Sequence, residues 1–224
     1  IGTGVQSDGW VRRKSVQAII ADPDHLGNTA LHICVKMGRP ECLRTLQAIE
    51  GSDPNLPGQG GYSPAVMCCD KNEGECMRQL MEAGIDVNQQ DDVGWTLLHH
   101  AAAARSLDVI SILMERENPF TVDDLGNQYI VEFPILVDLA NYTGHTALML
   151  ACTKNDTEVI EKLILGGADP CRIHISTSAS AYDMCASADA RDAVDRGLEQ
   201  RAVIMEQRAK DEEERLKKDL RESR

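Results

Sequence analysis

Cysteines and histidines are the residues of this sequence that could bind a metal or carry out nucleophilic chemistry. The eight cysteines are spread over 224 residues, which is unlike the dense disulfide framework of a short secreted domain. Cys68, Cys69 and Cys76, together with a histidine, could offer ligands to zinc, but their spacing matches no common zinc finger. His99 and His100 are adjacent, and adjacent side chains diverge on a helix. We therefore predict no metal site.

Motifs that would support catalysis are missing from the sequence. There is no glycine-rich phosphate loop, no nucleophile elbow and no His-Glu-x-x-His zinc motif. Carboxylates are abundant, but they fall in hairpins and on the C-terminal tail. We therefore predict that the protein is not an enzyme and uses no cofactor.

Charge and hydropathy exclude further classes of function. The 36 acidic and 23 basic side chains give a net charge of −13, whereas binding to a nucleic-acid backbone needs clustered Lys and Arg. No apolar run reaches the roughly 18 residues of a bilayer span, and the sequence shows no secretory signal. It begins at Ile1, which is compatible with a fragment. We expect neither nucleic acid nor membrane as a partner.

A repeated pattern determines where these residues lie. Five segments align on a Thr or Ser, at intervals of 34, 33, 50 and 34 residues. A glycine precedes the first four by two positions, and a leucine follows them by seventeen. Thr and Ser are good helix N-caps, and Gly38, Asn72 and Asn155 suit the left-handed end of the helix that follows. The aligned residues are Thr29, Ser63, Thr96, Thr146 and Ser180.

The pattern resembles that of the ankyrin repeat family, in which a turn glycine and Thr-Pro-Leu-His precede two short helices. Residues 27–34 (Gly-Asn-Thr-Ala-Leu-His-Ile-Cys) and 94–101 (Gly-Trp-Thr-Leu-Leu-His-His-Ala) match closely. The resemblance covers roughly residues 24–197 and implies an all-α ankyrin repeat solenoid of helix-turn-helix units with β-hairpin fingers. Residues 83–88 and 166–170 match as well.

Stacked repeats explain the low aromatic content and most of the cysteines. A helical hairpin cannot bury its apolar face alone, so we expect a core of aliphatic layers, consistent with 4% aromatic residues. The fifth repeat departs from the pattern, as a terminal repeat does, with Ser178 in place of the glycine and Gly197 in place of the leucine. Five cysteines occupy Ala or Val positions of other repeats and are expected to be buried. They are Cys34, Cys42, Cys68, Cys76 and Cys185. The candidates for exposed thiols are Cys69, Cys152 and Cys171.

Residues 1–23 precede the first repeat. An apolar stripe at helical spacing runs from Trp10 to Ile20. It predicts an N-terminal helical cap in which these two side chains cover the first leucine layer. A helix that binds a partner is the alternative.

An insertion at residues 118–143 lengthens the interval between the third and fourth repeats. It is too apolar for a disordered loop, and residues 129–131 and 135–137 predict short strands on either side of Phe133-Pro134. Two interpretations remain open, an elongated hairpin packed on its neighbours and an element that contacts a partner.

The C-terminal segment, residues 198–224, carries eight basic and eight acidic side chains, so the whole net charge belongs to residues 1–197. Pairs such as Glu206/Lys210 and Glu213/Lys217 have the favourable i, i+4 spacing of a charged helix. Its apolar residues are thinly spaced. A solvated helix and the start of a coiled coil are both compatible with this pattern.

The resemblance to ankyrin repeats implies contact residues at the hairpin tips and on the inner helix face. Carried over position by position, these residues include the aromatic side chains Tyr62, Trp95 and Tyr142, which are typical of an interface hot spot. Packing against the neighbouring finger is the alternative. The predicted protein-contacting residues are His25, Asn28, Met37, Tyr62, Asp70, Lys71, Asp92, Trp95, Tyr142, His145 and Lys154.

Two further implications follow from the family. His32 and His99 occupy the motif's histidine position, which resembles a structural hydrogen-bonding site that links adjacent turns. Asn88 follows Asp86 and Val87 in a hairpin similar to those modified by the asparaginyl hydroxylase that acts on ankyrin repeats. Ordinary hairpin geometry is the alternative for Asn88.

The sequence therefore predicts a non-catalytic, cytoplasmic protein–protein interaction module. It would bind a protein or peptide with a basic surface through its concave face and hairpin tips. The alternative is a structural subunit of a cytoskeletal or axonemal assembly, held by residues 118–143 and by a coiled-coil contact through residues 198–224.

Overall fold

The computed structural model describes most of the chain between residues 22 and 222. The predicted N-terminal cap, with Trp10 and Ile20, lies outside the described residues except for its last two positions. The described ranges are 22–49, 52–58, 61–115, 120–122, 128–130 and 135–222.

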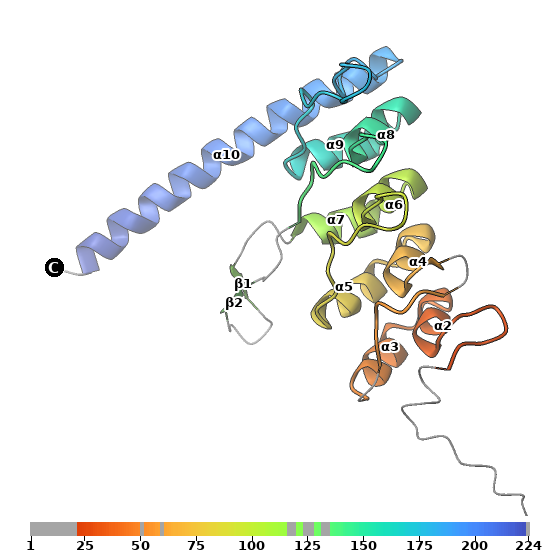
Figure 1. The fold of residues 1–224 in the computed structure, drawn as a ribbon. Coiled ribbons are helices and arrows are strands. Elements are labelled where there is room, and N and C mark those ends of the chain that lie inside the picture. Colours follow the sequence, from red (N-terminus) through yellow and green to blue (C-terminus); the bar gives the residue numbers. More distant parts are fainter. Residues whose placement is uncertain are drawn as a thin grey trace, which may run out of the picture.

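Pairs of short antiparallel helices stack in sequence order and form the body of the protein (Figure 1). The first helix of every pair lies on one side of the stack and the second helix on the other. The predicted all-α solenoid is confirmed. The pairs are α2 (Ala30–Lys36) with α3 (Pro40–Gln47), α4 (Pro64–Lys71) with α5 (Gly74–Glu82), α6 (Leu97–Ala104) with α7 (Leu107–Glu115), and α8 (Ala147–Lys154) with α9 (Thr157–Leu165).

Local sequence signals set the ends of the first helix in each pair. The aligned Thr or Ser is the N-cap in extended backbone, as at Thr146, where Oγ1 accepts a hydrogen bond from the Met149 N–H at 3.3 Å. Asn72 and Asn155 take the predicted left-handed conformation at the other end, with φ of 56° and 55°. Arg105 adopts the same conformation in the third repeat, with φ of 58°, which its residue type did not predict.

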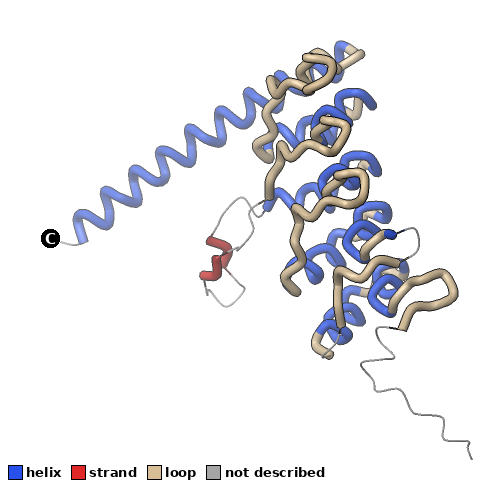
Figure 2. Tube along the Cα trace, in the orientation of Figure 1, coloured by secondary structure: helices blue, strands red, loops and turns tan. Residues whose placement is uncertain are grey.

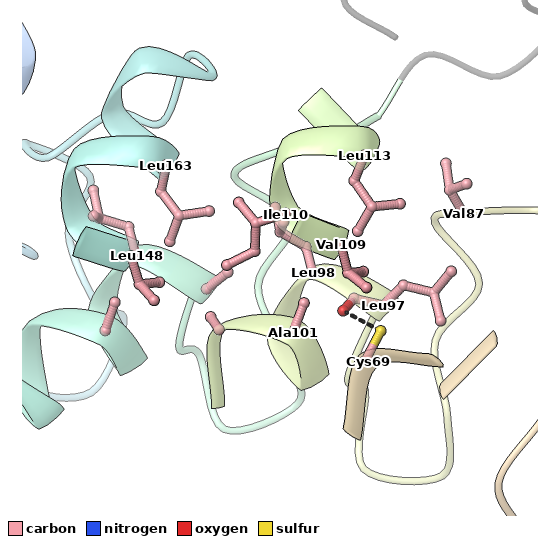
Figure 3. Packing of buried hydrophobic residues seen from close by; sticks show 14 of the residues in the cluster. Cys69, Val87, Leu97, Leu98, Ala101, Val109, Ile110, Leu113, Leu148 and Leu163 are labelled. Atoms are coloured by element: carbon pink, nitrogen blue, oxygen red, sulfur yellow. Dashed lines mark hydrogen bonds between the residues drawn. The ribbon is translucent and has the colours of Figure 1, made fainter. Parts of the chain in front are cut away.

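Aliphatic layers between successive helix pairs form the core (Figure 3). Leu98 and Leu113 come from the third repeat and Leu148 and Leu163 from the fourth, and none is more than 1% exposed. The predicted ladder of aliphatic side chains is confirmed, and it accounts for a core with few aromatic rings.

The structure corrects the prediction for four of the cysteines. Cys42 is exposed and Cys34 is only half-buried, because they lie in the first repeat, on which no earlier helix pair packs within the described part of the chain. Cys69 and Cys152 are fully buried, so the prediction of exposed thiols is wrong for both, and among the three candidates it holds for Cys171. The side chains at these two positions face the next repeat, as the Cys69 Sγ–H shows by donating to the Leu97 carbonyl at 3.4 Å (Figure 3).

The fifth repeat and the charged tail share one helix. Residues 181–184 form turns where a first helix is expected, and α10 (Ala188–Glu222) then runs for 35 residues without a break at the predicted boundary near residue 197. Ala193 and Val194 of α10 are buried, whereas the described side chains from Ala202 onward are exposed. The helix therefore extends past the stack (Figures 1 and 2).

The insertion contains a two-stranded antiparallel hairpin, β1 (Phe120–Val122) and β2 (Gln128–Ile130), with Thr121 opposite Tyr129 (Figure 2). The predicted strand around residue 129 is confirmed. The predicted strand at 135–137 is wrong, since that segment rejoins the repeat and its Leu136 N–H donates to the Asn88 side-chain carbonyl at 2.8 Å.

Candidate functional site

A tight turn, here called a finger, precedes the first helix of each repeat. In the third repeat the Asp91 carboxylate closes it, because Oδ1 accepts from the Val93 N–H at 3.0 Å and the Trp95 N–H at 2.7 Å. Asp24 and Asn141 close the corresponding turns of the first and fourth repeats. Sequence analysis missed this role, although the position five residues before the aligned Thr could have revealed it.

Buried histidines join consecutive fingers. His99 Nδ1 accepts from the Thr96 N–H at 3.2 Å and lies 2.8 Å from the Thr96 hydroxyl, so the neutral ring carries its proton on Nε2. That Nε2–H donates to the His145 carbonyl of the next finger at 2.9 Å. His32 makes the same bond to the Tyr62 carbonyl, also at 2.9 Å. The predicted linking role is confirmed, and burial lowers the pKa of both rings despite the carbonyl that favours the protonated form.

A close backbone approach fixes the spacing of the third and fourth fingers. Gly94 has φ of 81°, and a Cβ there would lie only 2.5 Å from the Tyr142 nitrogen. The Tyr142 N–H donates to the Val93 carbonyl at 3.3 Å. Gln90 Nε2 adds hydrogen bonds to the carbonyls of Gly94 at 2.7 Å and Ala140 at 3.0 Å. These hydrogen bonds therefore fix the third finger against the fourth repeat.

A groove with a volume of about 840 Å³ opens between the second and third fingers and the inner helices α4 and α6. It contains both aromatic side chains that the sequence placed at finger positions of these repeats, Tyr62 and Trp95. Four carboxylates line the same groove, and no Lys or Arg does so among the residues that the structure describes. These acidic residues are Asp70, Asp86, Asp91 and Asp92.

His100 organises the aromatic side of this groove. Its ring makes edge-to-face contacts with Tyr62 and Trp95, with centroid distances of 5.9 Å and 5.0 Å. Its Nε2–H donates to Asp91 Oδ2 at 3.0 Å. Burial opposes ionisation of Asp91, but the N–H donors of Trp95 and Val93 and the His100 ring outweigh it, so the pKa of Asp91 is lowered. The Tyr62 and Trp95 rings thus both pack against His100.

Four of the predicted contact residues meet in the groove, and the others are dispersed. Tyr62, Asp70, Asp92 and Trp95 line it. Asn28, also a predicted contact residue, is 4% exposed, and its side-chain oxygen lies next to Gly58 of the next finger. The exposed residues outside the groove are His25, Met37, Lys71, Tyr142 and Lys154.

Two predicted residues already have partners within the protein. The Lys154 ammonium donates to the Ala103 carbonyl at 2.6 Å, and the half-buried His145 ring packs on His174 with a centroid distance of 4.3 Å. The half-buried Asn88 anchors the end of the insertion through the Leu136 N–H.

No sequence signal indicated His100 as a groove residue, since Ile33, Met67 and Leu150 hold its position in other repeats.

The described residues offer little for metal or thiolate chemistry. No group of three or more His, Cys, Asp or Glu in them is placed to hold a metal ion. Burial raises the pKa of Cys76 to about 11 and also raises that of Cys69, so both thiols keep their protons at neutral pH. None of the described helices has the length and apolar character needed to cross a bilayer.

Comparison with known proteins identifies one recurrent domain. The model of a family described as ankyrin repeats (3 copies) matches residues 31–125 and 65–174. The E3 ubiquitin-protein ligase KEG of Arabidopsis thaliana is 33% identical over 98 residues, which is 43% of this chain and 6% of that protein. Transient receptor potential cation channel subfamily A member 1 of Homo sapiens is 28% identical over 112 residues, 50% of this chain and 9% of the channel.

A third relative, the L-asparaginase of Dirofilaria immitis, is 28% identical over 104 residues, 46% of this chain and 18% of that protein. The chain therefore spans less than a fifth of the length of each of these relatives. These relatives are a ubiquitin ligase, a cation channel and an asparaginase, so the likeness concerns a shared domain.

Proposed function

Because the chain belongs to the ankyrin repeat family, we propose that it is a non-catalytic protein-interaction module. In this proposal it binds a basic segment of a partner protein in the groove between its second and third fingers. Ankyrin repeats generally mediate protein–protein interactions. The proposal requires no cofactor and no chemical step.

The aromatic pair at the groove carries this proposal. Tyr and Trp are enriched among the residues that dominate binding energy, because they bury a large area at a small cost in side-chain entropy. Tyr62 is 44% exposed and keeps part of its ring available to a partner. Since His100 already orients Tyr62 and Trp95, a partner would not have to order them on binding.

Charge supports a basic partner. The four groove carboxylates face no Lys or Arg within the described lining, and the chain as a whole carries −13. An acidic groove with low-dielectric walls attracts cations and speeds their association, an effect that added salt weakens.

The structural-subunit hypothesis finds its support in α10. Val203 and Met205 on this helix are 67% and 52% exposed, although both are apolar. A coiled-coil partner would cover them. Deleting residues 202–224 would abolish incorporation into an assembly under this hypothesis, while binding at the groove would remain unchanged under the first.

A reducing compartment such as the cytosol fits the cysteines. All eight are free thiols, and Cys68, Cys69 and Cys76 lie in the packed core. Free thiols persist where the thiol pool is reduced. The cytoplasmic location remains part of the proposal.

Selection from a phage-displayed peptide library on the full-length chain tests the groove. We expect selected peptides to lose at least about tenfold in affinity on Tyr62→Ala or Trp95→Ala, equivalent to about 1.4 kcal/mol. Tyr182→Ala is the matched aromatic control, because Tyr182 is exposed in the fifth repeat, away from the groove residues.

Circular dichroism would establish that each variant retains its helices. Trp95→Phe keeps an aromatic ring and should retain most of the binding. Selected peptides that bind the two alanine variants as tightly as the native chain, with helicity intact, would overturn the assignment of the groove.

A further inference from the structure

We propose that the groove recognises an arginine side chain of the partner, with the guanidinium against the rings of Tyr62 and Trp95 and its charge neutralised by Asp70 and Asp92. This inference rests on the proposed function and specifies the chemistry that the groove reads.

The two aromatic rings and His100 define the place for the side chain. His100 is 8% exposed and lies deep, whereas Tyr62 is 44% exposed and stands at the rim. The His100 ring makes interplanar angles of 79° with Tyr62 and 60° with Trp95. A planar cation placed above His100 would therefore contact two aromatic side chains whose orientation is already set.

The carboxylates around these rings divide into two groups. Asp91 is fully engaged, because Oδ1 accepts from the Val93 and Trp95 amides and Oδ2 accepts from His100. It is a positioning residue, which holds Trp95 and His100 in place. Asp86 Oδ1 likewise accepts a hydrogen bond from the Asn88 N–H at 2.9 Å.

Asp70 and Asp92 are the groove carboxylates with both oxygens left for a ligand. Both are exposed, and neither forms an ion pair or side-chain hydrogen bond within the described part of the chain. Asp70 belongs to α4 and Asp92 to the third finger, so the two reach the groove from different elements. A single cation between them would gain from both charges.

The combination of rings and carboxylates favours arginine over lysine. A guanidinium is planar and weakly hydrated, stacks on aromatic rings and pairs with carboxylates through two parallel N–H donors. An ammonium is a compact, strongly hydrated charge and gains less from an aromatic surface. Citrulline has the same shape as arginine without the charge, so it separates charge recognition from packing.

Three synthetic probes test the inference on the full-length chain. They are the acetylated, amidated pentapeptides Gly-Gly-Xaa-Gly-Gly, in which Xaa is Arg, Lys or citrulline. Their binding would be followed at low salt by the NMR signals of Tyr62, Trp95 and His100. We expect the arginine peptide to bind at least about fivefold more tightly than the lysine peptide, and the citrulline peptide to cause no saturable shift.

Paired charge variants supply the control. Asp70→Asn combined with Asp92→Asn should weaken binding of the arginine peptide about tenfold or more. Glu82→Gln combined with Glu199→Gln removes the same charge from exposed positions outside the groove and should change binding less than twofold. Equal effects of the two pairs would mean that only the overall field attracts the probe, and would overturn the inference.

Equal binding of all three probes, or no binding of the arginine peptide, would also overturn it. The proposed function fails on different evidence, namely library peptides that bind without Tyr62 and Trp95. Library peptides that require both rings but tolerate Arg→Lys without loss would refute the arginine inference alone.

Discussion

The third and fifth repeats share one sequence pattern but have different structures. In the third repeat, α6 and α7 form a complete pair, Thr96 caps the first helix and His99 links two fingers. In the fifth repeat, turns replace the first helix, and the second continues into the 35 residues of α10. The third repeat packs against neighbours on both sides, whereas the fifth packs on the fourth repeat alone within the described chain. Packing on two sides enforces the pattern, and packing on one side relaxes it.

The finger turns show the same relaxation. Gly94 holds the left-handed position in the third repeat, and Ser178 occupies it in the fifth with φ of 54°. His174 takes the turn-closing role of Asp91, because its Nδ1 accepts from the Ser176 and Thr177 amides. Its buried Nε2 has no hydrogen-bond partner in the described chain. The terminal finger thus keeps its shape with less favourable residues.

The largest expected difference separates Leu113 of the third repeat from Leu198, which follows the fifth repeat on α10. Leu113→Ala should lower the free energy of unfolding by about 3 kcal/mol, because Leu113 is fully buried and its loss leaves a cavity. Leu198→Ala, at a site that is 39% exposed, should cost less than about 0.5 kcal/mol. Urea denaturation followed by circular dichroism measures both. Similar losses at the two sites would contradict the idea that packing from two sides makes the difference.

The second largest difference is expected between the stability losses caused by replacing His99 and His174. His99→Ala leaves the Thr96 donors and the His145 carbonyl without their buried partner and should cost about 2 to 3 kcal/mol. His174→Ala should cost about 1 kcal/mol, because it breaks bonds within one turn only. Thermal unfolding compares the two variants, with Leu113→Ala as a reference for a core defect. A larger loss at His174 would refute the linking role assigned to His99.

Substitutions of the turn residues Gly94 and Ser178 should change the free energy of unfolding in different directions. Gly94→Ala should cost about 2 kcal/mol, since the added Cβ meets the Tyr142 backbone and the residue has a positive φ. Ser178→Gly should leave stability unchanged or raise it by up to about 1 kcal/mol, because it relieves a left-handed non-glycine residue. Chemical denaturation measures both changes. Destabilisation by Ser178→Gly would show that the serine side chain supports the terminal finger.

Acid should act mainly on the histidines of the first, third and fourth repeats, with the smallest effect of the four predictions. Burial lowers the pKa of His32, His99 and His145 below the ordinary value of 6.5. The unfolded chain takes up these protons more readily than the folded chain, so stability is complete above about pH 6.5 and falls as the pH decreases below it. Unfolding curves at several pH values test this, and His99→Gln should flatten the slope. An unchanged slope in that variant would exclude His99 as a contributor.

Much of the fold was predictable because its signals are local. The N-cap of each first helix depends on a Thr or Ser and the backbone beside it, so Thr29 and Thr146 could be recognised without tertiary information. The burial of Cys69 and Cys152 was not predictable in this way. Both lie one position past the aligned alanine slot, and their burial depends on how closely the next repeat approaches.

The candidate groove was predictable only in part. Tyr62 and Trp95 could be placed at finger positions from the repeat alone. Their common contact with His100, and the engagement of Asp91 by both Trp95 and His100, depend on distances between separate elements. The pairing of β1 with β2 also escaped prediction, because short apolar segments do not specify their partners.

The sequence by itself determined the repeat, the helix ends, the aliphatic layers and the acidic charge of residues 1–197, because each depends on residue type at a fixed spacing. The tertiary structure alone decided which side chains converge. Tyr62 and Trp95 stand in different repeats and meet around His100 because α4 packs against α6, where the Cys69 thiol donates to the Leu97 carbonyl. The tertiary structure also decided how far α10 continues past the last repeat. No neighbouring helix pair covers its exposed end within the described chain.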